Sequence, residues 1–351
     1  MRVFSEQAIY HAPDRYHTNN IIKSLWNDST QEGRRELYGN WVDLFEYEPR
    51  LSRADVCLLT YQWPYYVNND RVAEAEAEVK VAKEAGKPMV VFSGGDYPAR
   101  TPFSDVILFE SAGYRSDPGY QYHSATPAFI GDYLEEYCGG ELLVREKQAQ
   151  PAVGFCGQAS LSPIQTAYRT FRLKWQQHQY RQGKIKWEPA PFETSSFRSR
   201  VLKEFEGKDG IQTNYLLRSQ YHGGDKNDKD LQARLKSDFV NNILNSDYTV
   251  CMRGGGNFSV RFYETLCLGR IPIFIDTDCL LPFQDAIEYK AIFPWIDMKD
   301  LPDASEILLD FHSRLSADDF KNLQVTCRNL WIEHMTADGF FRDLSCKLVG
   351  L

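Results

Sequence analysis

Several features that would assign this sequence to a membrane or secreted class are missing. Its longest apolar runs, such as Met89–Phe92 and Ile271–Ile275, are far shorter than the roughly 20 residues that span a bilayer as a helix. Its first residues lack the apolar core of a secretory signal peptide. These absences predict a soluble protein of the cytoplasm.

Paired cysteines and an excess of basic residues are missing too. The eight cysteines are scattered without a CxxC pair, which favours buried, reduced thiols over disulfides or a zinc site. Forty basic residues against 48 acidic ones give a net charge of −8, which argues against a protein that binds nucleic acid non-specifically. Nucleic acid is therefore not an expected partner.

The chain does have enough apolar sequence for two packed cores. Hydrophobic residues make up 43% of its 351 residues, and this length suits two domains better than one. A polar segment over 141–151 is a linker candidate. We expect a first domain over residues 1–148 and a second over 149–351, with a last helix that can pack back on the first domain.

Strand and helix patterns alternate in both halves of the chain. Strands are expected at 56–60, 89–92, 105–109, 152–156, 211–217, 248–252 and 271–275. Helices are expected at 69–85, 164–181, 197–205, 231–244 and 259–268. This rhythm predicts an α/β fold of two Rossmann-like domains with parallel sheets that face a central cleft. Ligands of such sheets bind beyond the carboxyl ends of the strands.

One segment, residues 248–269, combines the features of an anion site. A buried strand leads into three successive glycines and then into the start of a helix. The free N–H groups and the dipole of that helix favour an anion, and Arg253, Ser259 and Arg261 add donors around the same position. Glu264 follows one turn later, where a carboxylate can bridge the hydroxyls of a ribose. The segment predicts a nucleoside-diphosphate site.

A structural alternative stays open for this segment, namely a glycine-rich turn beside a surface ion pair between Arg261 and Glu264. No Gly-Lys-Ser/Thr follows the glycines, so the segment is not a Walker A loop. No GxGxxG follows the first strand, which makes hydride chemistry less favoured.

The run Arg253-Gly, Ser259-x-Arg-Phe-x-Glu264, Ile271-Pro-Ile-Phe-Ile275 and Leu281-Pro-Phe283 resembles the exostosin family of glycosyltransferases. Ser93-Gly-Gly-Asp-Tyr-Pro98 resembles a loop in the N-terminal half of that family. The resemblance implies the GT-B architecture and an inverting transfer from a nucleotide sugar of the UDP or GDP type. The acceptor would be a hydroxyl of a glycan or glycolipid, in polysaccharide or glycoconjugate synthesis.

The sequence departs from animal exostosins in two respects. Those proteins carry basic residues where this chain has Gly255 and Gly256, and they are membrane-anchored and often fused to a second transferase domain. A soluble microbial or viral member is the natural expectation. Peripheral membrane contact stays open, because the acceptors of such enzymes are often linked to lipid.

Asp96 is the candidate catalytic base, because it ends a strand on a Gly-Gly loop that would face the cleft. A turn carboxylate that binds its own backbone is the alternative. Weaker candidates for the base are His11, His17, Glu110 and His123. The candidate donor-binding residues are Gly157, Arg218, Arg253, Asn257, Ser259, Arg261 and Glu264.

Asp276-Thr-Asp278 has the DxD pattern with which other glycosyltransferases hold a divalent metal. A strand-end loop explains it equally well, and we expect neither a metal nor another cofactor. Trp63-Pro-Tyr-Tyr66 offers sugar-stacking rings, although aromatic clusters are usually core. Two rival functions remain: a non-catalytic exostosin-like module that binds glycan or scaffolds a partner, and a nucleotide-sugar epimerase.

Overall fold

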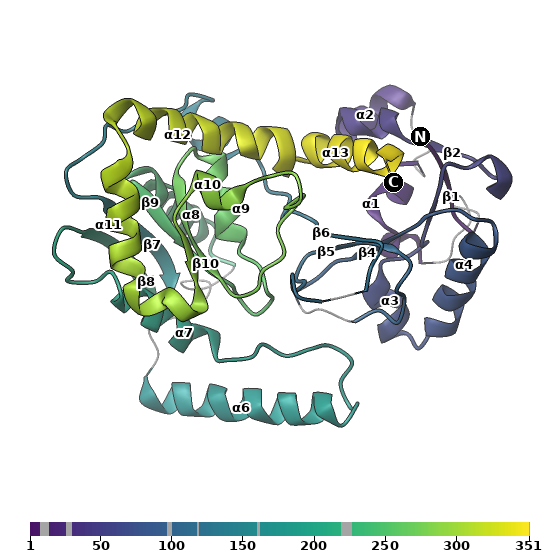
Figure 1. Ribbon diagram of the computed structural model, residues 1–351, viewed down its shortest axis with the longest axis horizontal. Coiled ribbons are helices and arrows are strands. Elements are labelled where there is room, and N and C mark those ends of the chain that lie inside the picture. The colour runs from purple at the N-terminus through teal and green to yellow at the C-terminus, as the bar shows by residue number, and fades with distance from the viewer. Residues whose placement is uncertain are drawn as a thin grey trace.

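Two parallel β-sheets form the framework of the computed structural model, which describes residues 1–7, 14–25, 30–96, 100–117, 119–159, 162–218 and 227–350. The two sheets lie side by side along the longest axis of the molecule (Figure 1). This architecture confirms the predicted α/β class and the arrangement of two Rossmann-like domains that defines GT-B.

The first sheet has six strands in the order β2-β1-β3-β4-β5-β6, and every pairing is parallel. Its strands are β1 (Arg2–Phe4), β2 (Glu46–Tyr47), β3 (Val56–Leu58), β4 (Met89–Ser93), β5 (Ile107–Glu110) and β6 (Tyr122–Ala125). The helices in this half are α1 (Asn20–Leu25), α2 (Gln31–Tyr38), α3 (Trp63–Asn68) and α4 (Val72–Glu84). Separate apolar clusters cover the two faces of the sheet.

The rings at 63–66 belong to the core of this first domain. Trp63 and Tyr66 lie on α3 and are buried in the cluster that also holds Ala75 and Ala82 of α4. Tyr66 donates to the buried carboxylate of Glu78 at 2.6 Å. The alternative of an aromatic core, and not a sugar-stacking surface, holds for these two rings.

The second sheet has five parallel strands in the order β11-β10-β9-β7-β8. Its strands are β7 (Ala152–Gln158), β8 (Gln212–Arg218), β9 (Tyr248–Cys251), β10 (Ile271–Asp276) and β11 (Trp295–Asp297). Its helices are α6 (Pro163–Arg181), α7 (Thr194–Lys203), α8 (Lys229–Leu244), α9 (Val260–Cys267), α10 (Tyr289–Ile292), α11 (Ala304–Arg314) and α12 (Ala317–Leu330).

The chain passes between the two cores twice. Going forward, it crosses before α5 (Tyr133–Cys138), because Tyr133 and Leu134 already pack in the core of the second sheet. The polar segment at 141–151, which suggested the boundary at 148/149, therefore lies on the second body. Going back, α12 runs through the π-helical turn Trp331–Met335 into α13 (Ala337–Gly350).

Helix α13 packs on the first domain (Figure 1). Phe340, Phe341, Leu344 and Leu348 on α13 are buried in the core of the first sheet. The ring of Phe341 stacks on Trp41 with centroids 3.9 Å apart. One helical stretch thus ties the two domains together beside the crossing at α5, where Asp132 pairs with Arg328 of α12.

All eight cysteines are free, and six of them are buried. Burial raises the pKa of the Cys57 thiol to about 11 and that of Cys279 to about 12. The expected burial thus holds for these six cysteines. Among the described residues, no helix combines the length and the apolar character needed to cross a membrane.

Candidate nucleotide site

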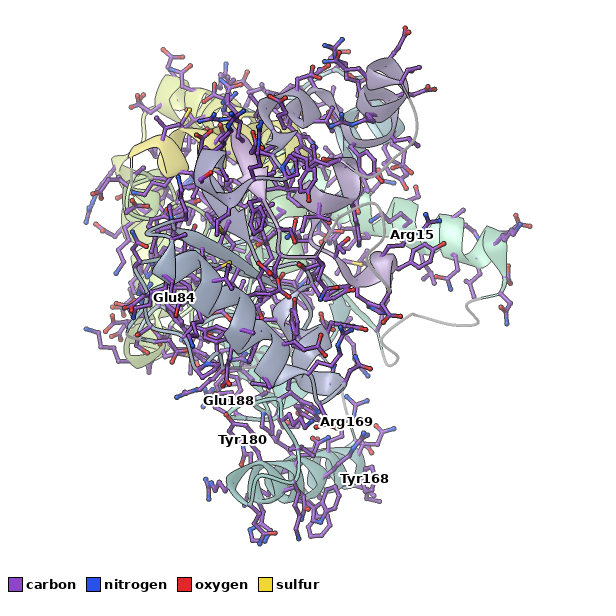
Figure 2. All side chains as sticks on the ribbon, turned by 90° about the vertical axis from the view of Figure 1, so that its right-hand side faces the viewer. Arg15, Glu84, Tyr168, Arg169, Tyr180 and Glu188 are labelled. Carbon is purple, nitrogen blue, oxygen red and sulfur yellow. The ribbon has the colours of Figure 1, made fainter. Side chains whose placement is uncertain are left out.

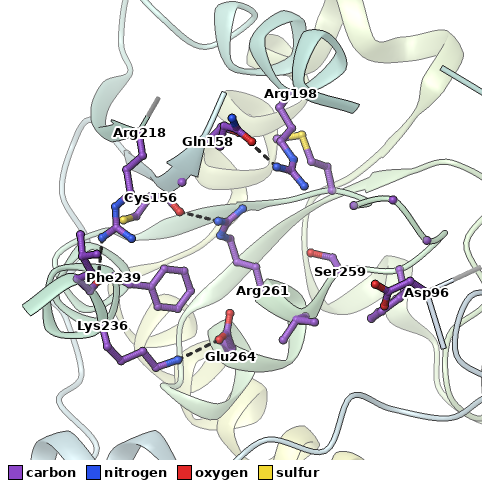
Figure 3. Close-up of a pocket in the computed structure, with 18 of the residues that line it drawn as sticks. Asp96, Cys156, Gln158, Arg198, Arg218, Lys236, Phe239, Ser259, Arg261 and Glu264 are labelled. Atoms are coloured by element: carbon purple, nitrogen blue, oxygen red, sulfur yellow. Dashed lines mark hydrogen bonds and ion pairs between the residues drawn. The ribbon is translucent and has the colours of Figure 1, made fainter. Parts of the chain in front are cut away.

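A cavity of about 500 Å³ opens where β7, β8 and β9 of the second sheet end (Figure 3). Its wall is formed by the last residues of β7, by Arg218 at the end of β8, by the glycine-rich loop after β9 and by the first turns of α9. Asp96 of the first domain closes one side. The position agrees with the general rule that ligands bind beyond the carboxyl ends of parallel strands.

Helix α9 begins at this cavity. Its N-cap residue Ser259 has extended backbone angles, and its side chain makes no capping hydrogen bond. The backbone carbonyl of Ser259 accepts from Phe262 N–H at 3.1 Å, so the helix is formed from its first turn. Ser259, Val260 and Arg261 all line the cavity. The positive end of the helix dipole therefore points into the open space.

Arg261 is held in place by backbone and aromatic contacts. Its Nη2 donates to the carbonyl of Cys156 at 2.6 Å, and its guanidinium lies 4.1 Å from the ring centroid of Phe155. A Cβ on Gly157 would lie 3.0 Å from the same Nη2. Glycine at 157 therefore leaves the room that this guanidinium occupies beside β7.

Glu264 lies one turn further along α9 and forms a cluster with Lys236 of α8 and Tyr133 of α5. Its Oε1 accepts from Tyr133 Oη at 2.9 Å and pairs with Lys236 Nζ at 3.4 Å. Lys236 also donates to Tyr133 Oη and lies over its ring. Burial and, next, the charge of Glu264 raise the pKa of Tyr133 well above its ordinary range, so the phenol stays protonated.

Two further arginines face the cavity from opposite sides (Figure 3). Arg218 donates to the carbonyl of Leu235 at 2.8 Å, and Arg198 of α7 donates to the carbonyl of Gln158 at 3.2 Å. Together with Arg261 and Lys236 they give the cavity four cationic side chains, against the carboxylates of Asp96 and Glu264. A protein of net charge −8 thus has a locally basic cavity.

The structure places two of the candidate donor-binding residues outside the cavity lining. Arg253 is buried and donates to Asn257 Oδ1, Tyr114 Oη and Gly255 O at 3.0–3.2 Å. Asn257 is fully buried and donates to the carbonyls of Gly113 and Asp278 at 3.1 Å. Both residues shape the glycine-rich loop and fix it against the first domain.

Asp96 lies on the cavity wall that the first domain provides. A Cβ on Gly256 would lie 2.1 Å from the backbone oxygen of Asp96. The glycine-rich loop of one domain therefore touches the strand-end loop of the other, and only a residue without a side chain allows this approach.

Of the weaker candidates for the base, His17, Glu110 and His123 are not among the residues that line the cavity. His123 Nε2 lies 2.6 Å from Glu110 Oε1, and both residues are largely buried within the first domain. His17 stacks on Tyr65 with centroids 4.7 Å apart. His11 lies outside the described residues.

The DxD pair takes part in a contact between the domains. Asp276 pairs with Arg115 Nη2 at 2.7 Å, and its Oδ1 accepts from the N–H of Cys279 at 3.0 Å. Asp278 accepts from the hydroxyl of Ser116. The strand-end alternative thus accounts for both carboxylates. Within the described part of the chain, no three His, Cys, Asp or Glu side chains gather in a way that could hold a metal ion.

Sequence reasoning missed Arg198, Lys236, Gln158 and Phe239 on the cavity wall. For α8, the sequence does contain a pattern that could have helped. Four cavity-lining residues of this helix stand at helical spacing, namely Gln232, Leu235, Lys236 and Phe239. The spacing shows that they share a face. Only the packing of α8 beside β7 shows that this face meets the cavity.

Residues 179–311 match the exostosin GT47 domain. They include α7, β8, α8, β9 and α9, and hence most of the cavity wall. The match covers less than half of the chain. The resemblance seen in the motif around Arg261 and Glu264 is thereby confirmed, and both residues face the cavity.

Plant proteins are among the curated relatives of this chain. It is 30% identical over 79 residues to "Probable beta-1,4-xylosyltransferase IRX10L" of Arabidopsis thaliana, a match that covers 22% of this chain and 19% of the relative. It is also 30% identical over 79 residues to "Probable glucuronosyltransferase Os02g0520750" of Oryza sativa subsp. japonica, covering 22% and 18%. The match spans about a fifth of the length of each relative.

Solved structures overlap only distantly. The crystal structure of TarM matches with a TM-score of 0.37 at 9% identity and covers 84% of this chain and 54% of that one. WaaG, described as a glycosyltransferase involved in lipopolysaccharide biosynthesis, matches with a TM-score of 0.31 at 8% identity over the whole of both chains. The two parallel sheets are instead evident from the strand order of the chain itself.

Proposed function

We propose that this protein is a glycosyltransferase that moves a sugar from a nucleoside-diphosphate sugar to a hydroxyl of a glycan or glycolipid. The observation that carries the proposal is the cavity itself. Arg198, Arg218 and Arg261 and the open start of α9 converge on one space at the ends of three parallel strands, inside an exostosin GT47 domain. This is the arrangement that a diphosphate requires.

The donor would bind with its diphosphate at the start of α9. Ser259 and the guanidinium of Arg261 face that position, and Arg198 approaches it from α7. The ribose would lie one turn further, where Glu264 offers a carboxylate whose described contacts both involve Oε1. Lys236 and Tyr133 fix the orientation of that carboxylate. Both UDP and GDP suit these contacts, because none of them involves the base.

Catalysis would need charge stabilisation and a base. As the sugar leaves, negative charge grows on the diphosphate, and the three arginines and the helix start are fixed to offset it. In an inverting transfer a base must take the proton of the acceptor hydroxyl. Asp96 faces the same cavity from the other domain, so it is the residue to which we assign this role.

The test is release of nucleoside diphosphate from a panel of UDP and GDP sugars in the presence of mixed glycan acceptors. We expect turnover for the wild type and a loss of about a hundredfold or more in kcat for Asp96→Asn, in line with general base catalysis. Glu264→Gln should instead raise the KM for the donor. Glu84→Gln, an exposed carboxylate on α4, is the matched control and should leave both constants unchanged.

The rival functions give different results in the same assay. A non-catalytic exostosin module would release no diphosphate with any donor, and Asp96→Asn would change nothing that the assay measures. An epimerase would convert the sugar of the donor with no acceptor present and without releasing the diphosphate. Either result would reject the transferase.

A further inference from the structure

Helix α6 stands apart from the rest of the molecule. In Figure 1 it runs along the longest axis below the second domain, and the face that carries Arg169 and Gln177 meets the body. None of its 19 residues is buried. The helix is well formed, because Ser162 and Gln165 make a capping box and Pro163 occupies its first turn. Burial in a core therefore does not explain the large apolar side chains of this helix.

Large apolar side chains form one stripe along α6. Ile164, Tyr168, Phe171 and Trp175 are 82%, 65%, 72% and 56% exposed. With about 100° per residue, these four positions fall within an arc of about 60° and extend over roughly 16 Å of helix. Figure 2 shows Tyr168 on the side away from the body, whereas Arg169 and Tyr180 lie toward it. The stripe therefore faces outward.

The opposite face of α6 attaches it to the body. Arg169 donates to Ser195 Oγ at 3.0 Å, and Gln177 donates to the carbonyl of Ala190 at 2.8 Å. The segment after the helix reaches the first domain, where Lys186 donates to Val67 O at 2.7 Å and Glu188 pairs with Arg100 at 3.2 Å. Polar contacts of the helix and of the segment after it thus set the orientation in which the apolar stripe is exposed.

Positive charge accompanies the stripe. Residues 163–187 contain six basic residues and no acidic one, although the whole chain has a net charge of −8. On the helix, Arg172 and Lys174 flank the stripe at about 80° on either side of Ile164. An exposed apolar stripe with cations at its borders is the pattern of a helix that lies in the interface of an anionic membrane.

We infer that α6 docks the protein peripherally on an anionic lipid surface, with Ile164, Tyr168, Phe171 and Trp175 in the interface and Arg172 and Lys174 against the headgroups. A second copy of the chain fits this face less well, because it would place the same cations opposite one another. Since α6 runs along the longest axis, a membrane bound to it would lie below the molecule along its length. The inference does not depend on the proposed transferase activity.

The test is flotation of the full-length protein with vesicles of phosphatidylcholine alone or with added phosphatidylglycerol. We expect the wild type to float with the anionic vesicles and to stay behind with the neutral ones. Phe171→Ser together with Trp175→Ser should lower the bound-to-free ratio by about tenfold or more, because two apolar side chains leave the interface. Arg172→Gln with Lys174→Gln should lower it by about one order of magnitude at low salt.

Tyr16→Ser with Leu37→Ser is the matched control, because these exposed apolar residues lie outside α6. This variant should float as the wild type does, and all variants should keep the wild-type melting temperature. Failure of the wild type to float would overturn the inference, as would equal flotation of the Phe171/Trp175 variant. A wild-type dimer in light scattering that this variant converts to a monomer, without vesicle binding, would assign the stripe to self-association instead.

Discussion

At the scale of single residues, the candidate site depends on two glycines that allow close contacts. Gly157 leaves room for the guanidinium of Arg261, and Gly256 lets the loop after β9 touch Asp96 of the other domain. Arg253 and Asn257, which the motif suggested as donor ligands, are buried and satisfied within the loop. The same motif thus supplies residues that face the cavity and residues that build the loop around it.

Gly256→Ala is the prediction at this scale. The new Cβ would lie 2.1 Å from the carbonyl oxygen of Asp96, so one of the two loops must move. We expect a loss of about 1–3 kcal/mol in the free energy of unfolding, measured by urea denaturation. Gly131→Ala is the control, because a Cβ there meets nothing within 4 Å. Equal stability of the two variants would show that the loops do not press on each other.

At the scale of elements, the start of α5 lies where the chain passes from the first domain to the second, and Asp132 at this position also contacts α12. Asp132 caps α5 by accepting from Leu134 N–H at 3.0 Å, and it pairs with Arg328 of α12 at 2.6 Å. Burial acts to raise the pKa of Asp132, but the ion pair with Arg328 and the backbone hydrogen bonds outweigh it, so the pKa falls below its ordinary value of 3.8. The ionised carboxylate therefore stabilises the fold.

The sign of this shift gives a pH prediction. Because the pKa of Asp132 is lower in the folded state, its stabilisation is present above about pH 4 and is lost as the pH falls below that value. Asp132→Asn should cost about 1–2 kcal/mol at pH 7, since the group is partly exposed. The difference from wild type should shrink when thermal melts are recorded between pH 4 and pH 3. A difference that does not change with pH would contradict the role of the charge.

The elements that sequence patterns predicted best are those with strong local signals. The spacing in α6, α8 and α9 and the apolar runs in β4, β7, β9 and β10 led to nearly the observed bounds. Short edge strands such as β2 (Glu46–Tyr47) were missed, because two side chains are too few to show the alternation of apolar and polar residues that marks a strand. Of the candidate donor-binding residues, Arg218, Ser259, Arg261 and Glu264 line one cavity, and their binding of a donor stays a prediction. Arg198 and Lys236 required the packing of α7 and α8, which no local pattern encodes.

At the scale of the whole molecule, the two domains are joined by two adjacent crossings of the chain and by a contact at the cavity. The crossing before α5 and the continuous stretch from α12 to α13 tie them together, and Asp96 meets the loop after β9 at the cavity. A donor bound at α9 would therefore face the first domain, from which we expect the acceptor to approach. We therefore expect this cavity to bind a nucleoside diphosphate.

The most direct measurement is thermal stability in the presence of UDP, GDP, CMP and dTDP for the wild type, Arg261→Gln and the exposed control Arg314→Gln. A nucleotide at about 100 times its Kd should stabilise the wild type and the control by about 2.7 kcal/mol. We predict that one nucleoside diphosphate does so and that Arg261→Gln loses most of the effect. If no nucleotide raises the melting temperature, or if Arg261→Gln responds as the wild type does, the cavity is not the donor site.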